Sequence, residues 1–188
     1  MKKKIVLASG NKHKLIEISE ILTDFEIVSC KDLGFNEDIV EDGSTFYENA
    51  LIKAKTVSEA LGIPALADDS GICVKALNDG PGIYSARYSK EGTDEANLDF
   101  LLENMKGVTD REAKYVCCLV YYDNGKIVTA TGETYGKILY EREGSSGFGY
   151  DPIFYSDDLK KSIGLSTPEE KNKISHRYRA LKELKEKL

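Results

Sequence analysis

The sequence lacks any long hydrophobic run. No apolar segment approaches the roughly 20 residues that a helix needs to cross a bilayer. The N-terminal Met1-Lys2-Lys3-Lys4 is followed by an apolar stretch that is too short for the hydrophobic region of a secretory signal. We therefore expect neither a membrane partner nor an export signal.

Cysteine pairs at metal-binding or redox spacing are also missing. The four cysteines show no C-x-x-C spacing and lie mostly in apolar, strand-like runs: Cys30, Cys73, Cys117 and Cys118. We expect buried, reduced thiols rather than zinc ligands or disulfides, which places the protein in the cytoplasm.

An excess of basic charge is absent as well. The net charge of -6 and the pI near 5.1 argue against nucleic acid as the main partner, because duplex binding usually needs a basic face. No internal repeat, low-complexity stretch or interdomain linker divides the chain. With 41% hydrophobic and 31% charged residues, the sequence predicts one domain over residues 1–188, long enough for two lobes around a cleft.

The stretch Leu66–Gly71 organises the rest of the chain. An apolar approach runs into Asp68 and Asp69, and a second apolar run follows Ser70-Gly71, which predicts two acids at a strand end. Adjacent side chains in a strand point to opposite faces, but a Ser-Gly turn can direct both carboxylates to one site. One acid could then hold a cation while the other activates water; an acidic surface turn is the alternative.

The N-terminal segment reads as strand, polar loop and helix. A short β-rich run over residues 4–8 leads into loop 9–14, and apolar residues at helical spacing follow. A loop at a helix N-terminus favours an anion, and Lys12 and Lys14 add positive charge. Because the loop is neither a Walker loop nor G-x-G-x-x-G, a capped helix with solvated lysines is the alternative, and we expect His13 to be solvated or capping.

A second acidic residue precedes the next predicted helix. Glu41 lies shortly before a helix over residues 46–61, for which Thr45 and Glu48 have the form of a capping box. A ligand role for Glu41 is reasonable at this position. Lys53 lies off the apolar stripe of the helix and could reach into a cleft, although a solvated lysine is the default interpretation.

The C-terminal half combines a long hairpin with a glycine-rich loop. Strands over residues 114–122 and 126–135 are joined through Asn124-Gly125, a strong hairpin signal. In the following loop, glycines frame Phe148, which is therefore better placed to stack on a flat ligand than to pack in the core. A phenylalanine closing the edge of the core is the alternative.

The last helix begins with basic residues. Ser175 is a plausible N-cap, so His176 and Arg177 fall in the first turn, with Lys171 close by in sequence. Arginine can donate a forked pair of hydrogen bonds to the keto edge of a purine, and a surface basic cluster is the alternative.

These features together are what hydrolysis of a nucleoside triphosphate requires: cations for the phosphates, a positioned water and a flat pocket for the base. No cysteine or serine has an evident histidine partner in the sequence, which disfavours a covalent nucleophile.

Six motifs occur in an order that resembles the inosine triphosphate pyrophosphatase (XTP/dITP diphosphatase) family. They are Ser9–Lys14, Glu41–Phe46 with Glu48–Ala50, Ala67–Gly71, Pro81–Arg87, Phe148–Pro152 and Ser175–Arg177. The resemblance extends from Ile5 to Leu184. It implies a mixed α/β fold with a long, twisted central sheet, flanking helices and an active site in the cleft between two lobes. It also implies a homodimer that uses Mg²⁺ to cleave ITP, dITP and XTP to the monophosphate and pyrophosphate, removing deaminated purines from the precursor pool.

The resemblance also assigns roles to individual residues. The triphosphate would be held by Ser9, Gly10, Asn11, Lys12, His13 and Lys14. Lys53 would neutralise charge on the phosphates, and Ser70 would contact the substrate. Glu41 and Asp69 would hold Mg²⁺, and Asp69 would activate the water with support from Asp68. The base would stack on Phe148, with Gly149, Tyr150, Asp151, Lys171, His176 and Arg177 around it.

The sequence departs from the family pattern in three places. Ser9 replaces a common threonine, Ser145-Ser146 replaces part of a common Gly-Thr-Gly approach to the aromatic residue, and Tyr178 stands where glycine is common. The first change keeps the hydroxyl, whereas the other two concern the shape of the base pocket. Two other functions remain open: a related pyrophosphatase that prefers pyrimidine or methylated nucleotides, and a nucleotide-binding protein without catalysis.

Overall fold

The computed structural model describes residues 2–188, except for the side chain of His13, so the predicted role of that side chain lies outside the described residues. The chain divides into two compact units. Unit 1 comprises residues up to Asp69, Cys117–Gly132 and Arg179–Leu188, and unit 2 comprises Ser70–Val116 and Glu133–Tyr178. Each unit is described by itself.

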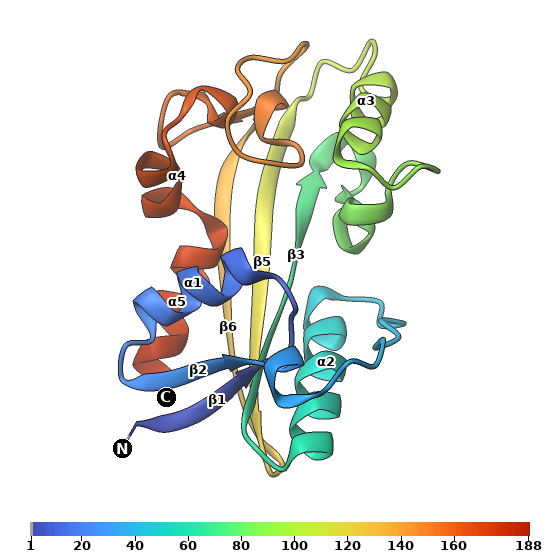
Figure 1. The fold of residues 1–188 in the computed structure, drawn as a ribbon. Helices are drawn as coiled ribbons and strands as arrows, with labels where there is room; N and C mark the ends of the chain where they lie inside the picture. The colour runs from blue at the N-terminus through green and yellow to red at the C-terminus, as the bar shows by residue number, and fades with distance from the viewer. Residues whose placement is uncertain (1) are drawn as a thin grey trace. The chain divides into compact units, whose positions relative to one another are not determined.

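Strands and helices alternate in the first part of the chain. The strands are β1 (Lys3–Leu7), β2 (Phe25–Ser29), β3 (Ala65–Val74), β4 (Gly80–Pro81), β5 (Glu112–Asp123), β6 (Lys126–Ile138), β7 (Phe154–Ser156) and β8 (Lys161–Ser162). The α-helices are α1 (Lys12–Ile21), α2 (Phe46–Leu61), α3 (Asp94–Asn104), α4 (Pro168–Ile174) and α5 (His176–Lys187) (Figure 1).

The strands form one mixed sheet. Their order is β2-β1-β3-β5-β6-β7-β8, and β4 pairs with β3. Strand β1 runs parallel to β2 and β3, whereas the pairs β3–β4, β6–β7 and β7–β8 are antiparallel. The predicted mixed α/β fold with helices around a central sheet is therefore confirmed.

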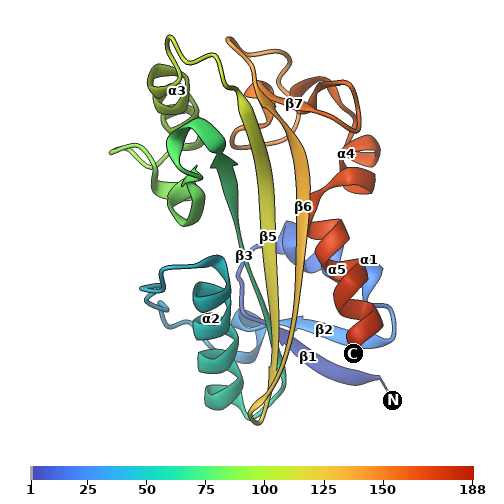
Figure 2. The ribbon, with the colours of Figure 1, turned by 180° about the vertical axis from the view of Figure 1, so that it is seen from behind.

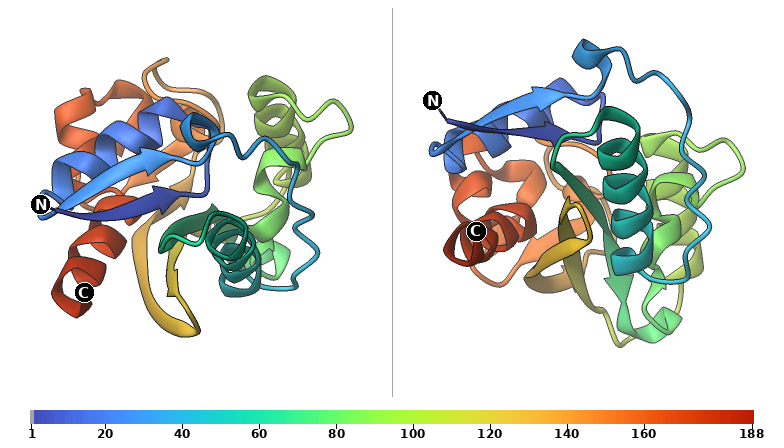
Figure 3. Two further views of the ribbon diagram at one scale, coloured as in Figure 1. Left: turned by 60° about the horizontal axis from the view of Figure 1, so that its bottom comes forward. Right: turned by 90° about the horizontal axis from the view of Figure 1, so that it is seen from below.

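Unit 1 buries both faces of its part of the sheet. In β1, Ile5 and Leu7 belong to an apolar cluster with α1 and α5, whereas Val6 belongs to a second cluster with α2. The alternation follows from the two-residue period of a strand, which sends successive side chains to opposite faces. Helices α1 and α5 consequently cover one face and α2 covers the other (Figures 1 and 3).

Unit 2 has a core of its own. Ile72 and Val74 from β3 pack with Leu98 and Leu101 from α3, and Phe154 from β7 belongs to the same cluster. Helices α3 and α4 lie on opposite sides of the strands of this unit (Figure 2).

Strand β3 corrects one prediction from the sequence. Its ten residues run without interruption through Ser70-Gly71, so the predicted strand end and turn at this point are wrong. Ala67 and Ile72, on either side of the acids, are both fully buried, and burying both keeps the chain extended. Asp68 and Asp69 therefore point to opposite faces of the sheet.

Several local predictions can be compared with the structure. Asn124 and Gly125 both have positive φ, as a two-residue type I′ hairpin turn requires, so the predicted hairpin is confirmed. Thr45 caps α2 by accepting a hydrogen bond from the Glu48 amide at 3.1 Å. The second hydrogen bond of the predicted capping box differs. The Glu48 carboxylate accepts it from the backbone amide of Ser44, at 2.6 Å.

Further differences concern short elements. Residues Lys75–Leu77, which follow the end of β3, form a 3₁₀ turn, and Gly82–Arg87 form another. Helix α4 was not predicted, although Thr167 and Glu170 complete a capping box at its start. All four cysteines are free and buried, as expected. Within residues 2–188, no helix has both the length and the apolar character that crossing a membrane demands.

Candidate active site

On one face of β3, Asp68 forms an ion pair with a lysine from α1. The Lys14 ammonium lies 2.9 Å from Asp68 Oδ1, and the Asp68 side chain is 1% exposed. A buried carboxylate needs such a cationic partner, because burial of an isolated charge is costly. The pair therefore fixes Lys14, the last residue of the segment predicted to hold phosphates.

That loop connects β1 to α1. The Ser9 hydroxyl accepts a hydrogen bond from the Asn11 amide at 3.2 Å, and Asn11 Oδ1 accepts from the Lys14 amide at 3.4 Å. Lys12 is exposed at the first position of the helix. The helix N-terminus and the lysines give the loop a positive character that suits an anion.

On the other face of β3, Lys53 joins two carboxylates. Its ammonium lies 2.8 Å from Glu41 Oε2 and 3.8 Å from Asp69 Oδ1, and its side chain is 14% exposed. The alternative of a solvated lysine is thus excluded by the structure. Glu41 and Asp69 are far apart in the sequence, yet both carboxylates contact the Lys53 ammonium group.

Asn49 supports this group and was not assigned a role from the sequence. Its amide nitrogen donates to Asp69 Oδ2 at 3.2 Å, and its oxygen accepts from the Gly43 amide at 2.9 Å. A Cβ on Gly43 would lie 2.8 Å from Asn49 Oδ1, so glycine permits this close approach. Asn49 therefore links the loop that carries Glu41 to β3, a long-range contact that sequence periodicity does not reveal.

The surroundings of Asp69 shift the pKa of its carboxyl group. Burial raises its pKa, while Lys53 and the hydrogen bond from Asn49 act in the opposite direction. A carboxylate with a raised pKa is a stronger base.

The donor chemistry of Glu41 and Asp69 suits a hard divalent cation. Among the described residues, no three His, Cys, Asp or Glu side chains gather into a ready-made metal cage. Mg²⁺ does not need one, because it is commonly held by one or two carboxylates together with substrate phosphates and water. The two carboxylates beside Lys53 therefore fit such an ion.

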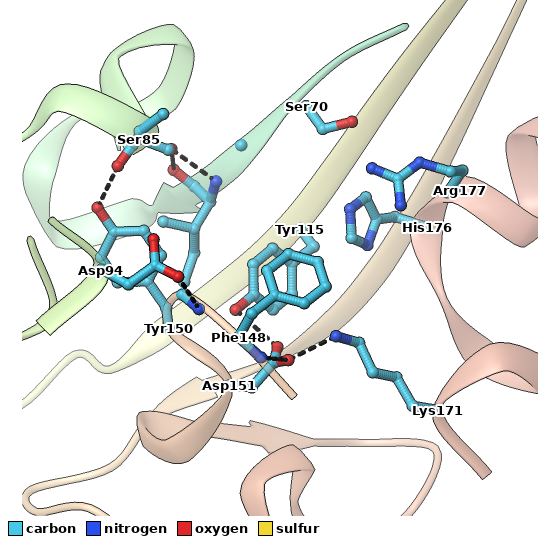
Figure 4. Close-up of a pocket in the computed structure, with 14 residues that line it drawn as sticks. Ser70, Ser85, Asp94, Tyr115, Phe148, Tyr150, Asp151, Lys171, His176 and Arg177 are labelled. Carbon is cyan, nitrogen blue, oxygen red and sulfur yellow. Dashed lines mark hydrogen bonds and ion pairs between the residues drawn. The ribbon is translucent and has the colours of Figure 1, made fainter. Parts of the chain in front are cut away.

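Unit 2 contains a pocket of mixed apolar and polar character (Figure 4). Its lining includes every residue predicted from the sequence to surround the base, together with Ser70. The lining residues are Ser70, Gly71, Ile72, Ser85, Ala86, Asp94, Tyr115, Phe148, Gly149, Tyr150, Asp151, Lys171, His176 and Arg177.

Asp151 is the centre of the polar network in this pocket. Its buried carboxylate accepts hydrogen bonds from the Tyr115 hydroxyl at 3.1 Å and the Phe148 amide at 2.9 Å. The Lys171 ammonium lies 2.5 Å from the same carboxylate. Residues that are distant in sequence are thereby fixed around one anion, and Lys171 in particular is oriented toward the pocket (Figure 4).

Phe148 lies outside the core. Its side chain is 63% exposed, which excludes the alternative of a phenylalanine at the core edge. The Lys171 ammonium lies 3.9 Å from the centre of the ring. Gly147 has a φ of +81°, and a Cβ there would collide with the Asp151 carboxylate, so the loop requires glycine at this position.

The remaining walls of the pocket come from three elements. The rings of His176 and Tyr115 stack at 5.0 Å with an angle of 13° between their planes. Arg177, which follows His176 at the start of α5, is buried. Tyr150 donates its hydroxyl to the Ser85 carbonyl oxygen at 2.6 Å, which fixes that hydroxyl away from a ligand.

Three residues with polar side chains in the pocket were not assigned a role from the sequence. Tyr115 belongs to an apolar β-run and gave no separate signal, although it contacts both Asp151 and His176. Asp94 accepts a hydrogen bond from the Gly149 amide at 3.1 Å, and the Ser85 hydroxyl accepts from the Ile72 amide at 2.9 Å. All three residues form contacts between segments that are separate in the sequence, and local sequence patterns do not reveal such contacts.

The sequence matches known proteins along almost its entire length. The Ham1 family matches residues 5–187. A protein of Desulfotalea psychrophila named dITP/XTP pyrophosphatase is 49% identical over 185 residues, covering 96% of this chain and 83% of that protein. One of Haemophilus influenzae with the same name is 46% identical and covers 100% of both chains.

Solved structures agree with these sequence matches. The Staphylococcus aureus Ham1 protein superposes with a TM-score of 0.93 at 40% identity, covering 98% of this chain and 97% of the other. The Ham1 protein of Coxiella burnetii gives the same TM-score, identity and coverage. The resemblance inferred from the six motifs is thus confirmed, and the chain belongs to the Ham1 family.

Proposed function

We propose that this chain is a divalent-metal-dependent nucleoside triphosphate pyrophosphohydrolase that converts dITP, ITP and XTP to the monophosphate and pyrophosphate. The observation that carries the proposal is the arrangement around β3, where Lys14 pairs with Asp68 and Lys53 joins Glu41 to Asp69. The names of the relatives in Desulfotalea and Haemophilus support dITP and XTP as substrates.

Asp69 is the better candidate for the general base. Asp68 is nearly inaccessible and directly paired to Lys14, whereas Asp69 is 14% exposed and has a raised pKa. Asp69 accepts a proton from water as the water oxygen bonds to the α-phosphorus, and the bond from that phosphorus to the bridging oxygen breaks. Pyrophosphate leaves, and Asp68 acts by positioning Lys14.

Glu41 and Asp69 would hold Mg²⁺. A bound divalent cation neutralises charge on the phosphate oxygens and thereby favours attack by water. Lys53 keeps the two carboxylates at one place through its contacts with both. Asn49 fixes the orientation of Asp69 by donating to one of its oxygens.

The pocket of unit 2 would take the base. Phe148 offers an exposed ring for stacking, and Lys171 and Arg177 can donate hydrogen bonds to the O6 atom of a 6-keto purine. Adenine presents an amino group at that position, so these donors would be left unpaired and ATP would be rejected. Asp151 holds Lys171 in the orientation that this contact needs.

Two further predictions belong to this proposal. We expect a homodimer, which sedimentation or light scattering on the purified protein would establish. We also expect a cytoplasmic location, consistent with four free, buried cysteines.

The experiment that tests the proposal identifies the products. The purified protein is incubated with Mg²⁺ and ITP, dITP, XTP, GTP, ATP or dTTP, and pyrophosphate and orthophosphate are measured separately. The proposal predicts pyrophosphate, released mainly from ITP, dITP and XTP. Orthophosphate as the main product, tight binding without turnover, or a preference for dTTP would contradict it.

A further inference from the structure

Lys31 lies beside the loop between β1 and α1, although it comes from another part of the chain. It is the first residue of a 3₁₀ turn that follows β2. The Cys30 amide donates to the Leu7 carbonyl oxygen at 3.0 Å, and the Ser29 hydroxyl donates to the Ser9 carbonyl oxygen at 3.2 Å. These two hydrogen bonds hold the end of β2 against the start of the loop, so the backbone of Lys31 has a fixed position there.

The side chain of Lys31 extends over Gly10. A Cβ added to Gly10 would contact the Lys31 Cε atom and lie 2.7 Å from its Nζ atom. The side chain thus occupies the space that glycine leaves open, and the ammonium group is at the loop itself. Any residue larger than glycine at position 10 would displace this ammonium group.

The charges around the loop indicate which ligand the Lys31 ammonium group can bind. Lys14 is paired with Asp68, and Lys53 is paired with Glu41 and Asp69. Two lysines therefore face three carboxylates, which leaves a net charge of about -1 for this group before any metal binds. A triphosphate carries several negative charges, so cations that are not already matched by carboxylates are required nearby.

Lys31 meets this requirement. It is exposed, and among the ion pairs of the described side chains it has no carboxylate partner. An ammonium group without a carboxylate partner can bind phosphate oxygens without first breaking an ion pair. Lys14 would have to share its contact with Asp68 to do the same.

We infer that Lys31 binds the pyrophosphate portion of the substrate and so distinguishes triphosphates from shorter phosphate chains. The inference rests on the proposed function, in which Asp69 activates water at the α-phosphorus. Because Lys31 lies at the Gly10 loop and not among the contacts of Asp69, it is assigned to the phosphates that leave rather than to the one that is attacked.

The test compares Lys31→Met with Lys31→Arg, and uses Lys126→Met, an exposed lysine in the β5–β6 hairpin, as the matched control. Calorimetry measures binding of inorganic pyrophosphate and of IMP in the presence of Mg²⁺. Loss of one charge-assisted contact should weaken pyrophosphate binding about tenfold in Lys31→Met and leave IMP binding unchanged. Lys31→Arg should restore most of the affinity, and Lys126→Met should match the wild type.

Steady-state kinetics give a second readout. For Lys31→Met, the KM for dITP should rise about tenfold with kcat within about twofold of wild type, because the lost contact is a binding contact. Equal pyrophosphate affinity in wild type and Lys31→Met, equal weakening of IMP binding, or no pyrophosphate binding by the wild type would overturn the inference. Failure of the proposed function would be seen separately, as a wild-type protein that releases no pyrophosphate from dITP.

Discussion

The two units hold their polar residues in different ways. In unit 1, each acid on β3 pairs with a lysine from the helix that covers its face, Lys14 for Asp68 and Lys53 for Asp69. In unit 2, one buried carboxylate, Asp151, collects donors from three separate segments. The lysines of unit 1 are partly accessible, and we propose that they turn to phosphate oxygens, whereas the hydrogen-bonded network of unit 2 would frame a flat ligand.

Substitutions in the two units should therefore have different effects. Replacement of Asp68 or Asp69 by asparagine should alter the chemistry more than the stability, because the amide keeps a hydrogen-bond acceptor for the partly accessible lysine beside it. Changes to Asp151 should alter stability first, because its removal leaves a lysine and a tyrosine hydroxyl without their buried acceptor.

The largest expected effect is that of Asp69→Asn. Removal of the base should lower kcat for dITP by about 10³-fold, because general-base catalysis contributes a factor of this order. The thermal unfolding temperature should change little. Stopped-flow or steady-state measurement of pyrophosphate release tests this expectation.

Asp68→Asn is the matched control for that prediction. It changes the neighbouring acid on the opposite face of the strand, where the partner is Lys14 rather than Lys53. Its main effect should be on KM, because Lys14 is predicted to bind phosphates. Equal losses of kcat in both variants would mean that the two faces of β3 do not have separate roles.

Asp151→Ala should destabilise the protein by about 3 kcal/mol, because it breaks a buried ion pair and removes an acceptor from two further donors. Urea denaturation followed by circular dichroism measures the change in the free energy of unfolding. Phe148→Ala, which removes an exposed ring from the same loop, should leave that free energy within about 0.5 kcal/mol of wild type. A stability loss of similar size in both variants would contradict the view that Asp151 stabilises the pocket while Phe148 only offers a surface for stacking.

Arg177→Ala should narrow the selectivity for ITP over ATP by about tenfold, because one directional contact to a base edge contributes on the order of 1–3 kcal/mol of discrimination. The measurement is the ratio of kcat/KM for the two nucleotides. Lys173→Ala, an exposed lysine on α4, serves as the control. An unchanged ratio in Arg177→Ala would contradict its assignment to the base pocket.

The smallest effect expected is on helix capping, where the two units should behave alike. Thr45 caps α2 in unit 1 and Thr93 caps α3 in unit 2, each by accepting a backbone amide hydrogen bond, at 3.1 Å and 3.2 Å. Thr45→Ala and Thr93→Ala should each lower the free energy of unfolding by about 1 kcal/mol. A loss in only one variant would show that the units differ in more than their polar networks.

Local features of the sequence predicted most elements of the fold. Apolar periodicity and the Thr45 cap predicted α2, and Asn124-Gly125 predicted the β5–β6 turn. The uninterrupted course of β3 could not be predicted in this way, because Ser70-Gly71 has the composition of a turn. The strand continues only because Ile72 and Val74 are buried against residues that are distant in sequence.

Local sequence features also predicted only part of the candidate site. Residues in recognisable motifs, such as Asp69 and Phe148, were predicted from the resemblance and from turn composition. Asn49, Tyr115 and Asp94 were not assigned, because their contacts join segments between 20 and 55 positions apart. The placement of Asp68 and Asp69 on opposite faces of the sheet could not be predicted from the sequence either, because it depends on β3 continuing past them.

The most direct test of the account follows the oxygen atom of the attacking water. Hydrolysis of dITP with Mg²⁺ in ¹⁸O-labelled water, followed by mass spectrometry of both products, shows which phosphorus is attacked. Attack at the α-phosphorus with Asp69 as base predicts that the label appears in dIMP and that pyrophosphate stays unlabelled. Label in pyrophosphate would contradict the account, because water would then have attacked the β-phosphorus.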